Sequence, residues 1–176
     1  MADILLVDGY NVINAWPDLS ALKDDLEHAR RKLVDILSGY GAYKDYRVVI
    51  VFDAHAVAKG KTCQETISEG LEVVFTREGE TADSYIEKAA YQQVRAGHGV
   101  YVVTSDWAEQ LTILGAGAWR ISSRELLEAV LEADKRIRET HCRSILNHRR
   151  HELANRLGRE VSERLDGMRR GRKPQE

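Results

Sequence analysis

The chain has 176 residues, of which 43% are hydrophobic and 31% are charged, and its formal net charge at pH 7 is −2. This length suffices for one domain with a substantial core plus an appended segment, and the composition excludes a wholly disordered chain. The charge is unevenly distributed, since residues 149–173 carry nine Lys or Arg and only four Asp or Glu. An acidic body with a basic end fits a metal site combined with a polyanion-binding arm, and it equally fits a solvated terminal helix.

Nothing in the sequence predicts a disulfide framework, a zinc site or a membrane span. Cys63 and Cys142 are far apart and form no Cys-x-x-Cys unit. Asp3 and Asp8 stand where a signal peptide needs a basic segment followed by an apolar core. No apolar run approaches the ~18 residues that a membrane-spanning helix needs. We therefore expect a cytoplasmic protein without membrane contact.

The first predicted strand, residues 4–7, is apolar at every position and runs directly into the polar segment 8–11. A strand without a polar face is typical of the centre of a parallel sheet that helices cover on both sides. A turn is predicted at residues 16–18. A helix is predicted over residues 22–37, because apolar residues recur three or four positions apart, and Gly39 and Gly41 are expected to end it.

Strands and helices alternate along the rest of the chain. Further strands are predicted over residues 47–52, 71–76, 100–104 and 119–121. The polar segment 54–69 is predicted to be a loop. Further helices are predicted over residues 83–96, 106–114 and 126–139. Ser122 and Glu125 have the spacing of a capping box that opens the last of these helices.

Alternating strands and helices joined by right-handed crossovers give an α/β fold of three layers with a central, mainly parallel sheet. We expect this domain to cover residues 1–140 and a basic helical extension to cover residues 141–176. The extension keeps a narrow apolar stripe, formed by Ile145, Leu153, Leu157, Val161 and Leu165. Such a stripe is typical of packing or dimerisation, so the extension has two interpretations, a packing helix and a polyanion-binding arm.

Each polar residue near a predicted strand end has an ordinary structural explanation. Asp8 and Asp53 could initiate turns, and Asp83 could complement the dipole of a helix that begins near it. Asp106 has the spacing of a helix cap, and Asn11 could be another local cap. For any one of these residues, the structural explanation is sufficient.

Together, these residues indicate a metal site, because four predicted strands are each followed by a carboxylate at the same edge of the sheet. In the strand order 3-2-1-4-5, Asp8 and Asp106 flank the crevice between strands 1 and 4, where such sheets bind ligands. Asp53 then lies beside Asp8, and Asp83 approaches from a helix start. Two carboxylates ~4 Å apart repel by roughly 4 kcal/mol at an effective dielectric near 20, and a divalent cation removes this repulsion. Oxygen ligands without cysteine or a histidine pair suit Mg²⁺ or Mn²⁺.

A metal site of this kind keeps coordination positions open for a phosphate and for a water molecule, whose pKa the metal lowers. Asn11, Thr81 and Ser105 are candidates to orient that water or phosphate. The basic candidates for contacts with flanking phosphates are Lys59, Lys61, Arg77, Arg149 and Arg150. Loop solubility alone would also explain the two lysines. Tyr10, expected on a loop, could stack on an unpaired base or pack in the core.

Four short motifs carry a resemblance to a known family: VDGYN at 7–11, FDAH at 52–55, ETAD at 80–83 and TSD at 104–106. With these motifs, residues 3–139 resemble the NYN branch of the PIN-like nucleases. More narrowly, they are similar to the bacterial YacP-type proteins, a family of ribosome-associated endoribonucleases. The resemblance implies a PIN-like α/β/α domain whose acidic core is Asp8, Asp83 and Asp106. Asn11, Asp53 and Ser105 would support that core.

We therefore predict a Mg²⁺- or Mn²⁺-dependent hydrolase that cuts single-stranded RNA internally, with mRNA on the ribosome as the expected substrate. The main alternative is a non-catalytic RNA- or ribosome-binding module with the same fold. Clustered carboxylates that serve no cation are costly to keep, which weighs against that alternative.

Overall fold

The computed structural model describes residues 3–53, 63–104 and 117–156, together with residues 161, 166, 167 and 169. For Cys63 and residues 147–156, only the backbone is described. The chain divides into two compact units, Met1–Ala133 and Asp134–Glu176, and the boundary falls within the last helix. Among the described residues, no helix combines the length and the apolar composition that crossing a lipid bilayer would need.

The first unit is built on a six-stranded sheet with the order β3-β4-β2-β1-β5-β6. The strands are β1 (Asp3–Asp8), β2 (Tyr46–Phe52), β3 (Cys63–Ser68), β4 (Leu71–Phe75), β5 (Val100–Val103) and β6 (Trp119–Ile121). All neighbouring strands pair in parallel except β3 and β4, which pair antiparallel. The order predicted for the five expected strands is confirmed, and β1 lies between β2 and β5 as expected.

The prediction of a loop over residues 54–69 is wrong for its second part, because residues 63–68 form the edge strand β3. Its described side chains are exposed, and its register against β4 shifts between Thr66 and Ser68. A polar strand of this kind is held by main-chain hydrogen bonds to its neighbour rather than by a buried face. Hydrophobic patterning therefore gave no signal for it.

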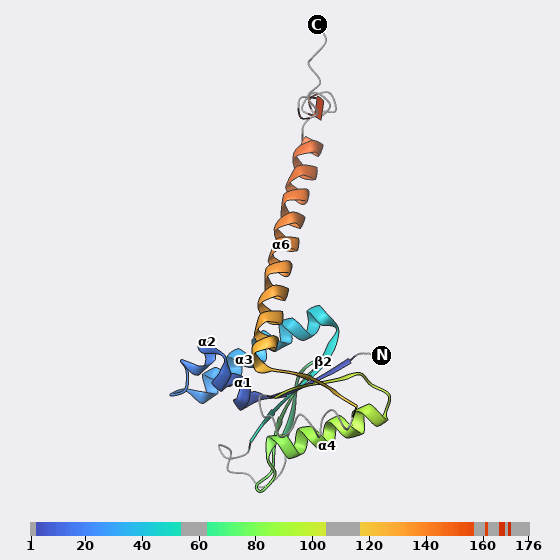
Figure 1. Ribbon diagram of the computed structural model, residues 1–176. Coiled ribbons are helices and arrows are strands. Elements are labelled where there is room, and N and C mark those ends of the chain that lie inside the picture. The colour runs from blue at the N-terminus through green and yellow to red at the C-terminus, as the bar shows by residue number, and fades with distance from the viewer. Residues whose placement is uncertain are drawn as a thin grey trace. The chain divides into compact units, whose positions relative to one another are not determined.

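Helices cover both faces of the sheet (Figure 1). They are α1 (Gly9–Ala15), α2 (Pro17–Ser20), α3 (Leu26–Lys44), α4 (Ala82–Arg95) and α6 (Ser123–Arg156). Side chains alternate along β1, so that Leu5 and Val7 join a core with α1, α3 and the start of α6. Ile4 and Leu6 face the opposite way and pack with α4. This arrangement confirms the three-layer α/β fold.

Helix α3 runs through both glycines that were expected to end it. A Cβ atom at Gly41 would lie 2.6 Å from Cγ2 of Val48, so this glycine allows the helix to approach β2 closely. The helix instead ends at Asp45, whose φ of 58° is left-handed. The expected turn at residues 16–18 includes the start of the short helix α2.

The capping box predicted for the last helix is confirmed. The backbone N–H of Ser122 donates to Oε2 of Glu125 at 2.7 Å, and the N–H of Glu125 donates to Oγ of Ser122 at 3.2 Å. This reciprocal pair satisfies two amide groups at the start of α6. The helix continues to Arg156, well past the predicted end at residue 139.

Candidate active site

Asp8 ends the central strand and caps the helix that follows it. Its Oδ1 atom accepts a hydrogen bond from the backbone N–H of Asn11 at 3.0 Å, which makes it the N-cap of α1. Between them, a Cβ atom at Gly9 would lie 2.2 Å from Cε1 of Phe52. Glycine therefore lets the chain turn from β1 into α1 against a buried ring, and this turn fixes the Asp8 carboxylate at the carboxyl edge of the sheet.

The surroundings of Asp8 raise the pKa of its carboxyl group from 3.8 to about 6. Burial is the largest cause, and the hydrogen bond from Asn11 opposes it. The negative charges of Asp83 and Asp53, and a hydrogen bond shared with the Asp83 carboxyl, raise the pKa further. Asp53 and Asp83 therefore both lie close enough to act on Asp8, and we name these three residues the acidic cluster.

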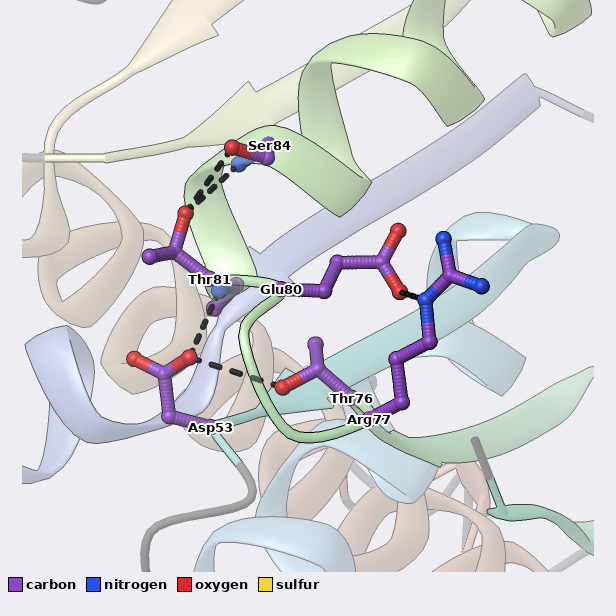
Figure 2. A network of polar contacts seen from close by, with 7 residues as sticks. Asp53, Thr76, Arg77, Glu80, Thr81 and Ser84 are labelled. Carbon is purple, nitrogen blue, oxygen red and sulfur yellow. Dashed lines mark hydrogen bonds and ion pairs between the residues drawn. The ribbon is translucent and has the colours of Figure 1, made fainter. Parts of the chain in front are cut away.

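Asp53 follows β2 and fixes the start of α4 (Figure 2). Its Oδ1 atom accepts hydrogen bonds from the backbone N–H of Ala82 at 2.8 Å and from Oγ1 of Thr76 at 3.5 Å. A carboxylate at this position also complements the positive end of the helix dipole. Because Asp83 is the next residue of α4, this contact holds the second carboxylate of the cluster near the first.

Thr81 serves as the N-cap of α4. Its hydroxyl oxygen accepts a hydrogen bond from the backbone N–H of Ser84 at 3.2 Å and contacts the Ser84 hydroxyl at 3.0 Å (Figure 2). The hydroxyl predicted to orient water or phosphate is thus engaged in holding the helix end.

The amide of Asn11 joins α1 to the start of α6. Its Oδ1 atom accepts a hydrogen bond from the buried hydroxyl of Ser123 at 3.3 Å. The carbonyl of Ser123 in turn accepts a hydrogen bond from Nε1 of Trp16 at 2.7 Å. The oxygen of the Asn11 amide therefore faces α6, and its NH₂ group is the part that can donate to a ligand.

The predicted third metal ligand, Asp106, and its neighbour Ser105 lie outside the described residues. Strand β5, which precedes them, pairs directly with β1, and Val103 lies opposite Val7. Among the residues that are described, no three His, Cys, Asp or Glu side chains are arranged around one metal position. Asp8 and Asp83 supply two oxygen donors whose mutual repulsion a divalent cation would relieve, so the donor set fits Mg²⁺ or Mn²⁺.

Residues 5–170 match the family model of the YacP-like NYN domain, which is most of the chain. The chain belongs to the YacP-like NYN family. Membership of this family implies a nuclease-like, RNA-related function.

Relatives from Bacillus subtilis agree with this assignment. The protein named "Uncharacterized protein YacP" from strain 168 is 48% identical over 136 residues, which is 77% of this chain and 79% of the relative. The crystal structure of Rae1 (YacP) is similar with a TM-score of 0.70 at 42% identity, covering 96% of this chain and 95% of that one. The structure of a mutant of Rae1 gives a TM-score of 0.69 at 44% identity, covering 82% and 83%.

The basic residues predicted to contact phosphates are placed only in part. In this NYN domain, Nε of Arg77 lies 3.3 Å from Oε2 of Glu80 (Figure 2). Both residues line a pocket of about 300 Å³ with Tyr85 and Lys88 on α4. Lys59 and Lys61 lie outside the described residues, and Arg149 and Arg150 belong to α6 with only their backbone described.

A group of aromatic side chains, two of them from the segments that follow Asp8 or precede Asp53, packs together, which was not predicted from the sequence. Tyr10 belongs to α1 rather than to the expected loop, and its ring packs edge-on against Phe52 with 5.1 Å between ring centroids. Phe52 stacks on Phe75 at 5.6 Å. Nη1 of Arg30 donates to the Tyr10 hydroxyl at 3.2 Å, and its guanidinium carbon lies 5.8 Å from the Phe75 ring centroid. The only feature of the sequence that could have indicated this contact is a basic residue, Arg30, next to the apolar positions of α3.

Proposed function

We propose that this NYN-family protein is a metal-dependent endoribonuclease that cuts single-stranded RNA internally. The observation that carries the proposal is the convergence of Asp8, Asp53 and Asp83, in which Asp53 holds the start of α4 and both neighbouring charges act on the buried Asp8 carboxyl. Three carboxylates close together repel one another unless a cation is bound, and a cation bound at this edge of the sheet could hold a phosphate. Family membership supports a nuclease-like activity.

Asp8 and Asp83, together with the predicted ligand Asp106, would hold Mg²⁺ or Mn²⁺. When bound, the cation would activate a water molecule and stabilise negative charge on the phosphate. Asp53 would act by holding α4, and with it Asp83, in place through its hydrogen bond from Ala82. The NH₂ group of Asn11 and the hydroxyl of Ser105 would orient the scissile phosphate or the water.

The substrate in this proposal is RNA, and mRNA on the ribosome is the expected form. The concentration of Lys and Arg over residues 149–173 supports a polyanionic partner, with Arg149 and Arg150 among the phosphate contacts. Lys59, Lys61 and Arg77 would neutralise phosphates closer to the cut. A cytoplasmic location would follow from this substrate.

A labelled RNA without self-complementarity tests the proposal directly. Incubated with the protein and Mn²⁺ or Mg²⁺, it should shorten to internal fragments, and EDTA should prevent this. Binding without shortening in either metal would instead support the non-catalytic module. A version of the same RNA labelled at both ends distinguishes internal cuts from trimming, since trimming releases only short terminal pieces.

A further inference from the structure

Arg30 is held by aromatic side chains rather than by a carboxylate. Its neighbour Arg31 forms an ion pair with Glu27 at 2.8 Å, and Arg77 forms one with Glu80. Arg47, Arg124 and Arg138 also have carboxylate partners. No Asp or Glu in the described part of the chain forms an ion pair with Arg30. Its described contacts are the Tyr10 hydroxyl and the Phe75 ring.

These contacts orient the guanidinium without neutralising its charge. A phenol hydroxyl is a neutral acceptor, and an aromatic ring attracts a cation through its quadrupole alone. Arginine has five N–H donors in a rigid fork that matches a phosphate or carboxylate. With Nη1 directed to Tyr10, the remaining donors and the full positive charge are available to an anion.

The rings that hold Arg30 belong to segments that also carry or contact residues of the acidic cluster. Tyr10 lies two residues after Asp8, and Phe52 directly precedes Asp53. Phe75 directly precedes Thr76, whose hydroxyl contacts Asp53. We name Tyr10, Phe52 and Phe75 the aromatic cradle. Each of its rings is thus tied to a segment that ends at the carboxyl edge of the sheet.

We propose that Arg30, oriented by the aromatic cradle, binds a backbone phosphate of the RNA that lies across the acidic cluster. The inference rests on the proposed function, because that function puts an RNA strand at this edge of the sheet. An RNA strand carries a phosphate at every nucleotide, so one that enters the acidic cluster must bring further phosphates past its borders. A guanidinium near the acidic cluster would attract such a flanking phosphate, in addition to any divalent cation held by the cluster.

If Arg30 had only a structural role, its packing would matter and its charge would not. The aliphatic stem of an arginine can cover an apolar ring, and this role needs packing but no charge. Methionine matches the aliphatic stem of arginine in length and remains apolar, so Arg30→Met keeps the packing of the stem and removes the charge. Arg31→Met is the matched control, because it removes the same charge one position away, where the side chain is 73% exposed and paired with Glu27.

The test is binding of a short fluorescein-labelled RNA without self-complementarity, measured by fluorescence anisotropy over a range of salt concentrations. The full-length Asp8→Asn protein serves as the background, since it is expected to bind RNA without cutting it. Arg30→Met should weaken binding by on the order of ten-fold. It should also reduce the slope of log affinity against log salt by about 0.7, the value for one phosphate contact on a single strand. Arg31→Met should change neither quantity to this extent.

The outcomes separate this inference from the proposed function. An unchanged salt slope in Arg30→Met, or an equal loss in Arg31→Met, overturns the phosphate contact even if the parent protein cuts RNA. A reduced slope confined to Arg30→Met supports the contact even if the parent protein proves unable to cut. Arg30→Lys provides a further check, because it restores the charge but not the fork and should recover part of the affinity with the full salt slope. Thermal unfolding of each variant reports whether the fold is retained.

Discussion

Asp53 and Ala82, 29 positions apart in the sequence, are joined by a hydrogen bond of 2.8 Å from the backbone N–H of Ala82 to the Asp53 carboxylate. This bond ties the end of β2 to the first residue of α4. Because Asp83 is the next residue, one contact sets the distance between two carboxylates of the acidic cluster. Asp53 therefore acts on the fold and on the site together, and the two effects can be separated by substitution.

Asp53→Ala removes the acceptor and leaves the Ala82 N–H unpaired at a residue that is 2% exposed. We expect a loss of about 2 kcal/mol in the free energy of unfolding, measured by urea denaturation. Asp53→Asn keeps an oxygen acceptor and should lose less than half as much. Equal losses in the two variants would show that the hydrogen bond does not hold α4.

Asp8→Asn should raise stability at pH 8 in EDTA. The pKa of Asp8 rises from 3.8 to about 6 on folding, so the folded protein binds more protons between these values and loses stability as the pH increases through them. The full cost above pH 6 is at most about 3 kcal/mol. Asparagine caps a helix as well as aspartate does, so the contact with the Asn11 N–H is kept.

The measurement for Asp8→Asn is the difference in unfolding free energy between variant and parent at pH 4, 6 and 8. The difference should be small at pH 4 and largest at pH 8. Mg²⁺ should stabilise the parent at pH 8 and have less effect on the variant. If the difference in unfolding free energy did not depend on pH, the pKa of Asp8 would not be raised in the folded protein.

Three glycines give a graded test of packing near the site. Gly9→Ala puts a Cβ atom 2.2 Å from the Phe52 ring and should cost about 2 kcal/mol or more, with reduced RNA cleavage. Gly41→Ala, with a Cβ atom 2.6 Å from Val48, should destabilise the fold without a specific effect on cleavage. Gly39→Ala, where nothing lies within 4 Å, should stabilise the protein by roughly 0.5–1 kcal/mol because alanine favours the helix. Circular dichroism during thermal unfolding gives the three values, and a different ranking would contradict the packing described here.

Ending the chain before Arg149 should weaken RNA binding and make it less sensitive to salt, because residues 149–173 carry nine Lys or Arg and only four Asp or Glu. The double substitution Arg149→Gln and Arg150→Gln should act in the same direction with a smaller effect. Ribosome co-sedimentation and anisotropy with labelled RNA provide the measurements. If truncation weakened binding but the double substitution did not, the segment would act by packing through its apolar stripe and not by contacting phosphates.

The strand order was predictable because buried parallel strands are apolar at every position, as in Ile4 to Val7 and Val48 to Phe52. Strand β3 was not, since its residues are polar and its place depends on hydrogen bonds to β4. Gly39 and Gly41 misled the prediction of the α3 terminus. Gly41 is needed because a Cβ atom there would clash with Val48, and this contact cannot be inferred from the neighbouring residues in the sequence.

The proximity of Asp8 and Asp53 could be expected for the same reason as the strand order, because parallel strands bring their carboxyl ends to one edge. The roles of the individual residues were harder to predict. Asp53 was expected beside Asp8, yet its anchoring of α4 depends on a backbone N–H that no pattern marks. Arg30 was missed entirely, because its partners Tyr10 and Phe75 are 20 and 45 positions away and only the folded chain brings them together.

The most direct measurement is the initial rate of cleavage of a labelled single-stranded RNA in Mn²⁺ by the parent protein, Asp8→Asn and Asp83→Asn, each shown to be folded. The account predicts internal fragments with the parent, prevented by EDTA, and a loss of cleavage in both variants with RNA binding retained. Cleavage by Asp8→Asn at the parental rate would contradict it.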